Sequence, residues 1–261
     1  MGVVNVTPDS FSDGGLCAST ESAIRHATQL ITEGADLLDI GGESTRPGAA
    51  AVSVAEELHR VIPVVEALVK LNAPTKVLIS VDTSKPEVMR AAIAAGAAMI
   101  NDVNALQAPG ALEAVAGSNV AVCLMHKQGE PRDMQHNPQY QDVVAEVKDF
   151  LQQRLDAAQA AGIPLERLVI DPGFGFGKTL EHNLELLRQL DCFTDMGVPV
   201  LAGLSRKSML GKITGNEVGD RVHASVAAAL LAAAKGARIL RVHDVKATRD
   251  ALAVFNAVEK Y

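Results

Sequence analysis

The stretch Val77-Leu78-Ile79-Ser80-Val81-Asp82 is apolar almost throughout and closes on a carboxylate. Other runs of the same length and character recur along the whole chain. Nearly continuous apolar runs of this kind are typical of parallel strands that are buried on both faces. The predicted strands are Gly2–Asn5, Leu37–Gly42, Val77–Asp82, Ala98–Asp102, Val120–His126, Leu168–Asp171, Pro199–Ser205 and Arg238–His243.

Helical patterns fill the gaps between these strands. Ser53-Val54-Ala55-Glu56 and Ser84-Lys85-Pro86-Glu87 both match the capping box that begins a helix. Gly162 and Gly236 mark the predicted ends of two later helices. Pro63 lies inside the second helical pattern, where we expect it to kink or interrupt the helix.

The regular alternation of strand and helix favours one α/β domain over residues 1–261, a (β/α)₈ TIM barrel. Such barrels commonly run to about 250 residues, and this chain has 261. An open doubly wound sheet predicts the same alternation and is the alternative. In a barrel, the active site lies at the C-terminal ends of the strands.

Composition restricts the class of partner. The net charge of −7 argues against binding to nucleic acid or to an anionic membrane surface. The longest apolar stretch, Ala224–Ala234, is too short to span a membrane, and the N-terminus does not resemble an export signal. Three cysteines without ligand-like spacing predict reduced thiols. We therefore expect a cytoplasmic protein that binds small molecules.

Polar residues close nearly every predicted strand, where the loops of a barrel build its active site. Any single one could instead cap the following helix, and for Asp102 this alternative is preferred. The residues at or just beyond the strand ends are Asn5, Asp82, Asn101, Asp102, His126, Asp171, Ser205, Lys207, Arg241 and His243.

Arg241 and His243 stand two residues apart in the last strand and therefore share one face. If that face lines the barrel interior, two cationic or donor groups there suit a phosphate or pyrophosphate. The alternative is an internal salt bridge from Arg241 to Asp82 or Asp171.

The glycine-rich stretch Asp171–Thr179 fits neither the spacing of a phosphate loop nor that of a dinucleotide-binding loop. A glycine-rich loop that exposes Phe174 and Phe176 instead suits a flat ring that stacks on an aromatic face. Two other polar loops, residues 7–15 and 43–48, are candidates to close over a substrate and bring in Asp9 and Arg46. The alternative is that both are plain surface turns.

Four motifs together resemble the bacterial dihydropteroate synthases, a family of pterin-binding barrels. They are Asn5–Asp13, Asp39–Gly48, Asp171–Lys178 and Ser205–Ser208. The resemblance runs from Met1 to the C-terminal helix. It implies a transferase of folate biosynthesis that joins p-aminobenzoate to 6-hydroxymethyl-7,8-dihydropterin pyrophosphate and releases pyrophosphate. Sulfonamides, which mimic p-aminobenzoate, would compete at the same place.

The resemblance also implies roles for individual residues. A carboxylate such as Asp171 can accept two adjacent N–H groups of a pterin ring. The implied pterin contacts are Asp82, Asn101, Met125, Asp171 and Lys207. The implied p-aminobenzoate contacts are Phe11, Thr45, Arg46, Pro47, Phe176 and Ser205. The implied pyrophosphate contacts are Asn5, Thr45, Arg46, Arg241 and His243, with Asn5 also binding Mg²⁺. The implied catalytic residues are Asp9, Arg46, Lys207, Arg241 and His243.

Two other functions remain open at this point. A pterin-binding methyltransferase module would share the barrel and the Asp and Asn contacts, but it needs neither the Phe11 loop nor a pyrophosphate site. An aldolase-type barrel would use Lys207 as a Schiff-base nucleophile. The family resemblance further implies a homodimer, formed through the later helices with their alanine-rich faces.

Overall fold

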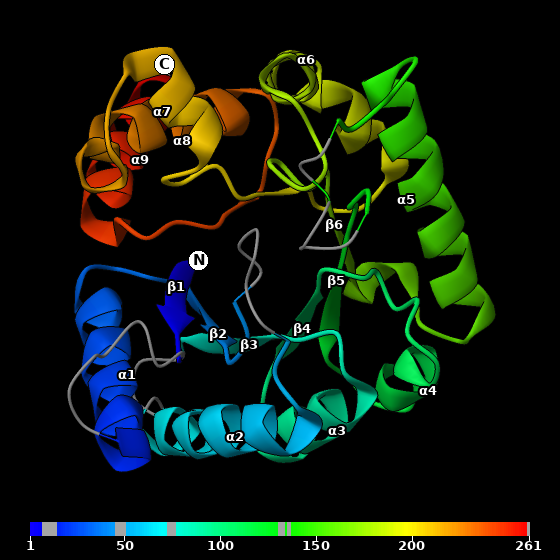
Figure 1. Cartoon of the computed structure of the whole chain (residues 1–261), viewed down its shortest axis with the longest axis vertical. Helices are drawn as coiled ribbons and strands as arrows, with labels where there is room; N and C mark the ends of the chain where they lie inside the picture. Colours follow the sequence, from blue (N-terminus) through cyan, green and yellow to red (C-terminus); the bar gives the residue numbers. More distant parts are fainter. Residues whose placement is uncertain (7–14, 45–50, 72–76, 130–133, 135–136, 260–261) are drawn as a thin grey trace.

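The computed structural model describes residues 1–6, 15–44, 51–71, 77–129, 134 and 137–259, with side chains from residue 20 in the first helix. Parallel strands alternate with helices along the chain (Figure 1). The strands are β1 Gly2–Asn5, β2 Leu37–Gly41, β3 Leu78–Asp82, β4 Met99–Asp102, β5 Ala121–Met125, β6 Leu168–Asp171, β7 Leu201–Ala202 and β8 Ile239–Leu240. All eight lie within the predicted runs.

The strands close into a barrel. Each of β1 to β6 pairs with the next in parallel, and β7 pairs with β8. Parallel bridges from Ile170 to Val200 and from Gly2 to Val242 join these two sheets at both sides. The hydrogen bond from Val3 N to Val242 O, 3.1 Å long, completes the contact between first and last strands. Strand order is therefore sequential around a closed ring, which confirms the barrel against the open sheet.

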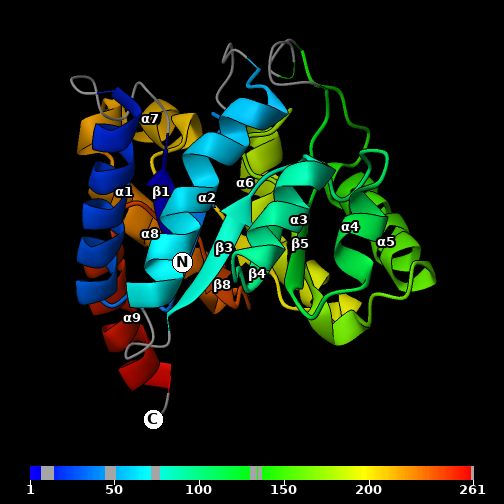
Figure 2. The same ribbon diagram turned by 90° about the horizontal axis from the view of Figure 1, so that it is seen from below.

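Helices surround the strands, as Figure 1 shows along the barrel axis and Figure 2 from the side. In the described part of the chain no helix is both long and apolar enough to cross a membrane. The α-helices are α1 Gly15–Thr32, α2 Val54–Leu71, α3 Pro86–Ala94, α4 Ala111–Ala116, α5 Val143–Ala160, α6 Leu180–Arg188, α7 Ser208–Thr214, α8 Val222–Ala234 and α9 Val245–Glu259. Short 3₁₀ helices are η2 Leu165–Arg167, η3 Leu190–Met196 and η4 Val218–Asp220.

Two expected helix signals differ from the structure. Pro63 does not interrupt α2, which runs from Val54 to Leu71, and the buried residues Val61 and Val64 pack into the core on both sides of the proline. Ser84 does not cap α3, since the N-cap is Lys85 and Pro86 occupies the first turn. Proline is favoured there because the missing N–H has no intrahelical partner in any case.

Alternation along each strand separates the apolar core from the polar interior. Residues of one parity, such as Leu38 and Leu124, belong to the large cluster that packs the strands against the helices. Residues of the other parity face the inside of the barrel. The lower part of that interior is a small apolar cluster around Met99 and Leu201. Asn101, two residues beyond Met99, is buried and polar. The interior therefore changes from apolar to polar toward the carboxyl ends of the strands.

Candidate active site

A buried carboxylate from β2, Asp39, gathers polar side chains across the barrel interior. Its Oδ1 accepts a 2.6 Å hydrogen bond from Ser80 Oγ. Its Oδ2 accepts 3.0 Å and 2.6 Å bonds from Asn101 Nδ2 and Arg241 Nε. Asp39 is 0% exposed, so these donors must satisfy the charge that water would otherwise solvate. Two predicted site residues, Asn101 and Arg241, are thereby held together.

Arg241 also pairs with Asp82, the last residue of β3, through a 2.9 Å bond from Nη2 to Oδ2. The internal salt bridge that the sequence left as an alternative is thus present. Burial works against the guanidinium charge, but Asp39 and Asp82 outweigh it and raise the pKa of Arg241. Burial raises the pKa of Asp82 to about 7, although Arg241 opposes the shift. These two ion pairs use only two of the five N–H donors of Arg241.

A second group of predicted residues surrounds Lys207, in the loop after β7. Its Nζ donates to the carbonyl of Phe174 and lies 4.7 Å from the centre of the Phe176 ring. Burial lowers the pKa of Lys207 to about 8, while the carboxylate of Asp171 favours the charged form. Phe176, Lys207 and Asp171 therefore form one site, in which a flat aromatic face, a cation and a carboxylate lie together.

Two glycines lie where the residues around Asp39 and Arg241 meet those around Lys207. A Cβ on Gly203 would lie 4.0 Å from both Lys207 Nζ and Arg241 Cδ, so the Lys207 ammonium group and the aliphatic part of the Arg241 side chain border the same space. Gly175 has a φ of +81°, which favours glycine, and a Cβ there would lie 3.2 Å from Lys207 Cδ. Small residues at both positions allow the two long cationic side chains to approach each other.

The loop after β6 orients Asp171. Gly173 N donates a 2.7 Å hydrogen bond to Asp171 Oδ1. Burial raises the pKa of this carboxyl, while Lys207 and the Gly173 amide oppose the shift. The expectation that Phe174 is exposed was wrong: its ring is fully buried in the core. The positive φ angles of Gly173 and Gly175 turn the chain on both sides of it. Of the two phenylalanines in this loop, only Phe176 is partly exposed.

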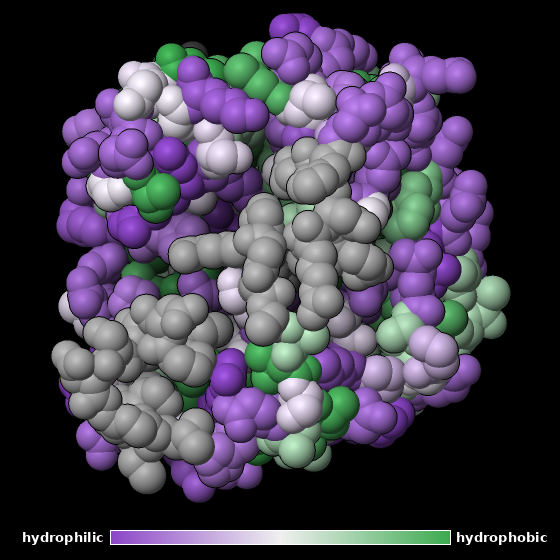
Figure 3. Space-filling view, viewed as in Figure 1, coloured by the Kyte–Doolittle hydropathy of each residue, from purple (hydrophilic) through white to green (hydrophobic). Residues whose placement is uncertain are grey.

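The remaining predicted residues that the structure describes lie at the strand ends. His243 Nδ1 lies 3.0 Å from Ser205 Oγ, which also accepts the backbone N–H of His243. Met125 ends β5 beside Asp171 in the β5–β6 register. Asn5 ends β1 beside Gly41 of β2. On this face of the molecule the described surface is mainly hydrophilic (Figure 3).

Five predicted residues lie outside the described part of the chain. The structure therefore says nothing about their placement, and the roles implied for them stay predictions. They are Asp9, Phe11, Thr45, Arg46 and Pro47.

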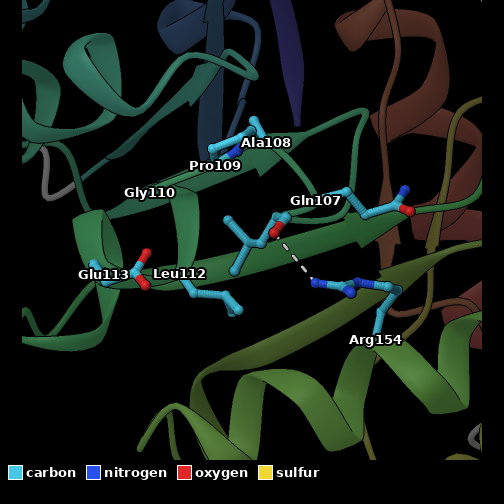
Figure 4. A pocket seen from close by; sticks show the side chains of 8 residues that line it. Gln107, Ala108, Pro109, Gly110, Leu112, Glu113 and Arg154 are labelled. Carbon is cyan, nitrogen blue, oxygen red and sulfur yellow. Dashed lines mark hydrogen bonds between the residues drawn. The ribbon is translucent and has the colours of Figure 1, made fainter.

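Asp102 has the structural role that the sequence favoured for it, because its side chain stabilises the turn that follows β4. Its carboxylate accepts hydrogen bonds from the amides of Asn104 and Leu106, both 2.8 Å long. Arg154 of α5 donates to the carbonyls of Ala105 and Leu106, as Figure 4 shows for one of these bonds. A surface hollow of about 380 Å³ lies beside this turn, and none of the predicted site residues lines it.

Several polar residues of the interior were not predicted from the sequence. Asp39 and Ser80 precede Gly41 and Asp82 by two residues, so strand parity alone could have placed them on the inner face. Lys85 was noted only as part of a helix start, but it pairs with Glu43, at 2.5 Å, and with the buried Glu57. No pattern in the sequence pointed to that cluster.

Comparisons with known proteins show the family to which the chain belongs. A family model described as "Pterin binding enzyme" matches residues 1–243. Dihydropteroate synthase of Escherichia coli (strain K12) is 52% identical over 257 residues, covering 98% of this chain and 90% of that protein. The structure of Xanthomonas albilineans dihydropteroate synthase with 4-aminobenzoic acid is 61% identical, with a TM-score of 0.94 and coverage of 100% and 93%. The Yersinia pestis enzyme in a sulfonamide drug complex is 50% identical, with a TM-score of 0.94 and coverage of 100% and 94%.

A closed parallel barrel with this polar interior, matched by that family model, is a pterin-binding enzyme of the (β/α)₈ class. Within this class, the chain belongs to the dihydropteroate synthases, which are transferases of folate biosynthesis. The resemblance carried by the four sequence motifs is thereby confirmed. The methyltransferase and aldolase alternatives are set aside.

Replacing Arg241 by methionine should lower the free energy of unfolding by about 3–5 kcal/mol, because Asp39 would remain buried without its cation. Arg249→Met is the matched control. Arg249 pairs with Asp36 at 3.2 Å, but both side chains are at least half exposed, and such pairs contribute about 0–1 kcal/mol. Urea denaturation compares the two variants. Equal losses would show that the Arg241 pairs add nothing beyond a surface ion pair.

Proposed function

We propose that the inward polar residues carry out the family reaction, in which p-aminobenzoate and 6-hydroxymethyl-7,8-dihydropterin pyrophosphate give 7,8-dihydropteroate and pyrophosphate. The main observation in support is that the ammonium group of Lys207 and the aliphatic part of the Arg241 side chain border one space next to Gly203. The carboxylate of Asp171 interacts with both of these cationic residues. One small space therefore offers acceptors for ring N–H groups and positive charge for a leaving anion.

In this proposal the pterin ring lies between the two polar groups. Asp171 and Asp82 accept its N–H groups, and Asn101 and Lys207 contact the remaining polar atoms. Asn101 already donates one amide N–H to Asp39, which orients its amide and fixes which atoms remain for the ligand. Met125, buried at the end of β5, supplies an apolar contact.

p-Aminobenzoate is placed against Phe176 and Ser205, on the outer side of Lys207. The distance of 4.7 Å from Lys207 Nζ to the Phe176 ring supports an aromatic site next to a cation. The Xanthomonas relative solved with 4-aminobenzoic acid supports the same substrate. We also assign Phe11, Thr45, Arg46 and Pro47 to this subsite on the family resemblance alone.

Pyrophosphate is assigned to Arg241 and His243, with Asn5, Thr45 and Arg46. The N–H donors of Arg241 that do not bond Asp39 or Asp82 are sufficient for two further contacts. The ion pairs and anion binding are therefore compatible. Fixed positive charge near the leaving oxygen stabilises the charge that develops as the bond breaks.

We infer that Asn5 would hold Mg²⁺. A Cβ on Gly41 would lie 3.8 Å from Asn5 Oδ1 and 4.0 Å from Asp82 Oδ2, so two oxygen atoms border this glycine. Oxygen donors are the ligands that Mg²⁺ prefers, and the ion commonly takes few protein ligands besides phosphates and water. When bound, the ion would neutralise part of the pyrophosphate charge.

The bond changes are those of a displacement at carbon. The amine nitrogen of p-aminobenzoate forms a bond to the exocyclic methylene of the pterin, and the methylene–oxygen bond breaks. The electron pair leaves on pyrophosphate, and the amine proton passes to water. Asp9 and Arg46 are assigned catalytic roles together with Lys207, Arg241 and His243. Asp171 and Lys207 hold the ring, so that the methylene faces the amine.

We further propose a cytoplasmic homodimer. Cys123 and Cys192 are both free thiols, in keeping with a reducing compartment. Helix α8 is apolar on all sides, yet Leu231 on it is 58% exposed. Ile213 of α7 is also exposed. A helix that is apolar all round is normally buried, so a second copy of the chain is the occupant we expect.

Pyrophosphate release should require both substrates, because the amine is the nucleophile of the proposed reaction. A coupled phosphate assay with each substrate alone and with both together measures this directly. Release at an undiminished rate without p-aminobenzoate would contradict the transferase reaction.

The kcat/KM for the pterin pyrophosphate should fall as the pH rises through about 8, because Lys207 then loses its charge. Burial lowers this pKa, so the charged form predominates only below that value, and kcat/KM reports the free enzyme. Lys207→Arg keeps its charge and should lack the decline, even if its turnover is lower. The same decline in that variant would assign the ionisation to another group.

Sedimentation equilibrium should give about twice the chain mass of 27.4 kDa. Leu231→Glu should shift the protein toward monomer, because it places a charge within the proposed apolar interface. Leu71→Glu is the control, since Leu71 of α2 is similarly exposed at 57% but lies on another helix. A wild-type protein that sediments as a monomer would refute the dimer.

A further inference from the structure

Lys178 is a buried lysine, only 3% exposed, to which the proposed reaction gives no role. Its Nζ lies 2.9 Å from His126 Nδ1 and donates bonds of 2.9 Å and 3.1 Å to the carbonyls of Gly173 and Phe176. Three acceptors thus match the three N–H donors of an ammonium group. All three of these partners are neutral.

These bonds fix both ends of the turn that contacts Lys207. Gly173 O and Phe176 O are the first and last carbonyls of a four-residue turn, which the bond from Phe176 N to Gly173 O also closes. Within this turn the Phe174 carbonyl accepts from Lys207 Nζ, and the Phe176 ring lies beside the same atom. A shift of the turn would therefore move both contacts of Lys207 together.

His126 connects Lys178 and the Gly173–Phe176 turn to strand β6 and helix α5. Its backbone N–H donates a 3.0 Å bond to the carbonyl of Asp171, next to the carboxylate assigned to the pterin. Its ring packs edge-on against Phe150 of α5, with centroids 4.9 Å apart. Tyr140 donates a 2.9 Å bond to the carbonyl of Gly177, which closes the loop on its other side.

A buried ammonium group is unfavourable unless nearby charge compensates for it. Burial lowers the pKa of Lys178 well below its usual value, although the carboxylate of Asp171 favours the charged form. Methionine would fill similar space without a charge, so stability alone does not account for a lysine here. What lysine adds is one nitrogen atom that bonds to three partners at once.

We propose that Lys178 and His126 are positioning residues, which fix the Gly173–Phe176 turn so that Lys207 and Phe176 meet p-aminobenzoate in the productive arrangement. This inference rests on the proposed function for the identity of the substrate. The contacts themselves do not depend on it.

The test compares four variants in steady-state kinetics. Lys178→Met and His126→Phe each remove one side of the contact, and we expect KM for p-aminobenzoate to rise on the order of tenfold. His126→Asn keeps an acceptor near the position of Nδ1 and should stay within about threefold of wild type. Lys70→Met, on an exposed residue at the far end of α2, is the matched control and should have no effect.

The His126→Asn variant distinguishes a positioning role from a general loss of stability, because it removes the packed ring but keeps the acceptor. A KM close to that of wild type in this variant would therefore point to the hydrogen bond. Equal losses in the Asn and Phe variants, or an unchanged KM in Lys178→Met, would overturn the proposal.

A measurement on the unmodified protein covers the case in which variants fail to fold. Burial and Lys178 lower the pKa of His126 to about 2, so ¹⁵N NMR should show a neutral ring from pH 8 down to 5.5. A His126 that titrates near 6.5 would show that the ring is not buried against Lys178 as described. Because this readout needs no substrate, it distinguishes failure of the inference from failure of the proposed reaction.

Discussion

The buried pair between Asp39 and Arg241 is the interaction on which the interior of this barrel depends. Asp39 comes from β2 and Arg241 directly follows β8, so the pair links the two sides of β1. Ser80 and Asn101 bond to the same carboxylate, and Asp82 bonds to the same guanidinium. An ion pair that is this buried contributes little net stability by itself, but losing one partner is costly. The pair therefore holds the surrounding side chains in one arrangement.

The proposed active site has two parts, which are the side chains bonded to Asp39 and Arg241 and the glycine-rich loop that Lys178 contacts. Asp171 ends a regular strand, while Phe176 lies on the glycine-rich turn that Lys178 fixes. Between them, Gly203 leaves space in which Lys207 and Arg241 come close. Burial is the main cause of the lowered pKa of Lys207, and repulsion by Arg241 lowers it further. The same repulsion favours a bound anion.

The sequence predicts the barrel well because each strand is a distinct apolar run that closes on a polar residue. Asp82, Asn101, Asp171 and Arg241 could be placed in the site for that reason. Asp39 was part of a family motif but was not assigned to the site, since it lies in mid-strand, where only its parity with Gly41 indicates an inward side chain. Phe174 and Lys178 could not be placed, because the φ angles of Gly173 and Gly175 decide which side of the loop each faces.

The central claim is that Arg241 is held by buried carboxylates and does not merely lie near them. The most direct test is a double-mutant cycle of Arg241→Met and Asp39→Asn, measured by urea denaturation. Removing both charges should recover roughly 1–3 kcal/mol relative to the sum of the two single losses, because no unpaired charge then remains at Asp39. Simply additive losses would contradict the claim.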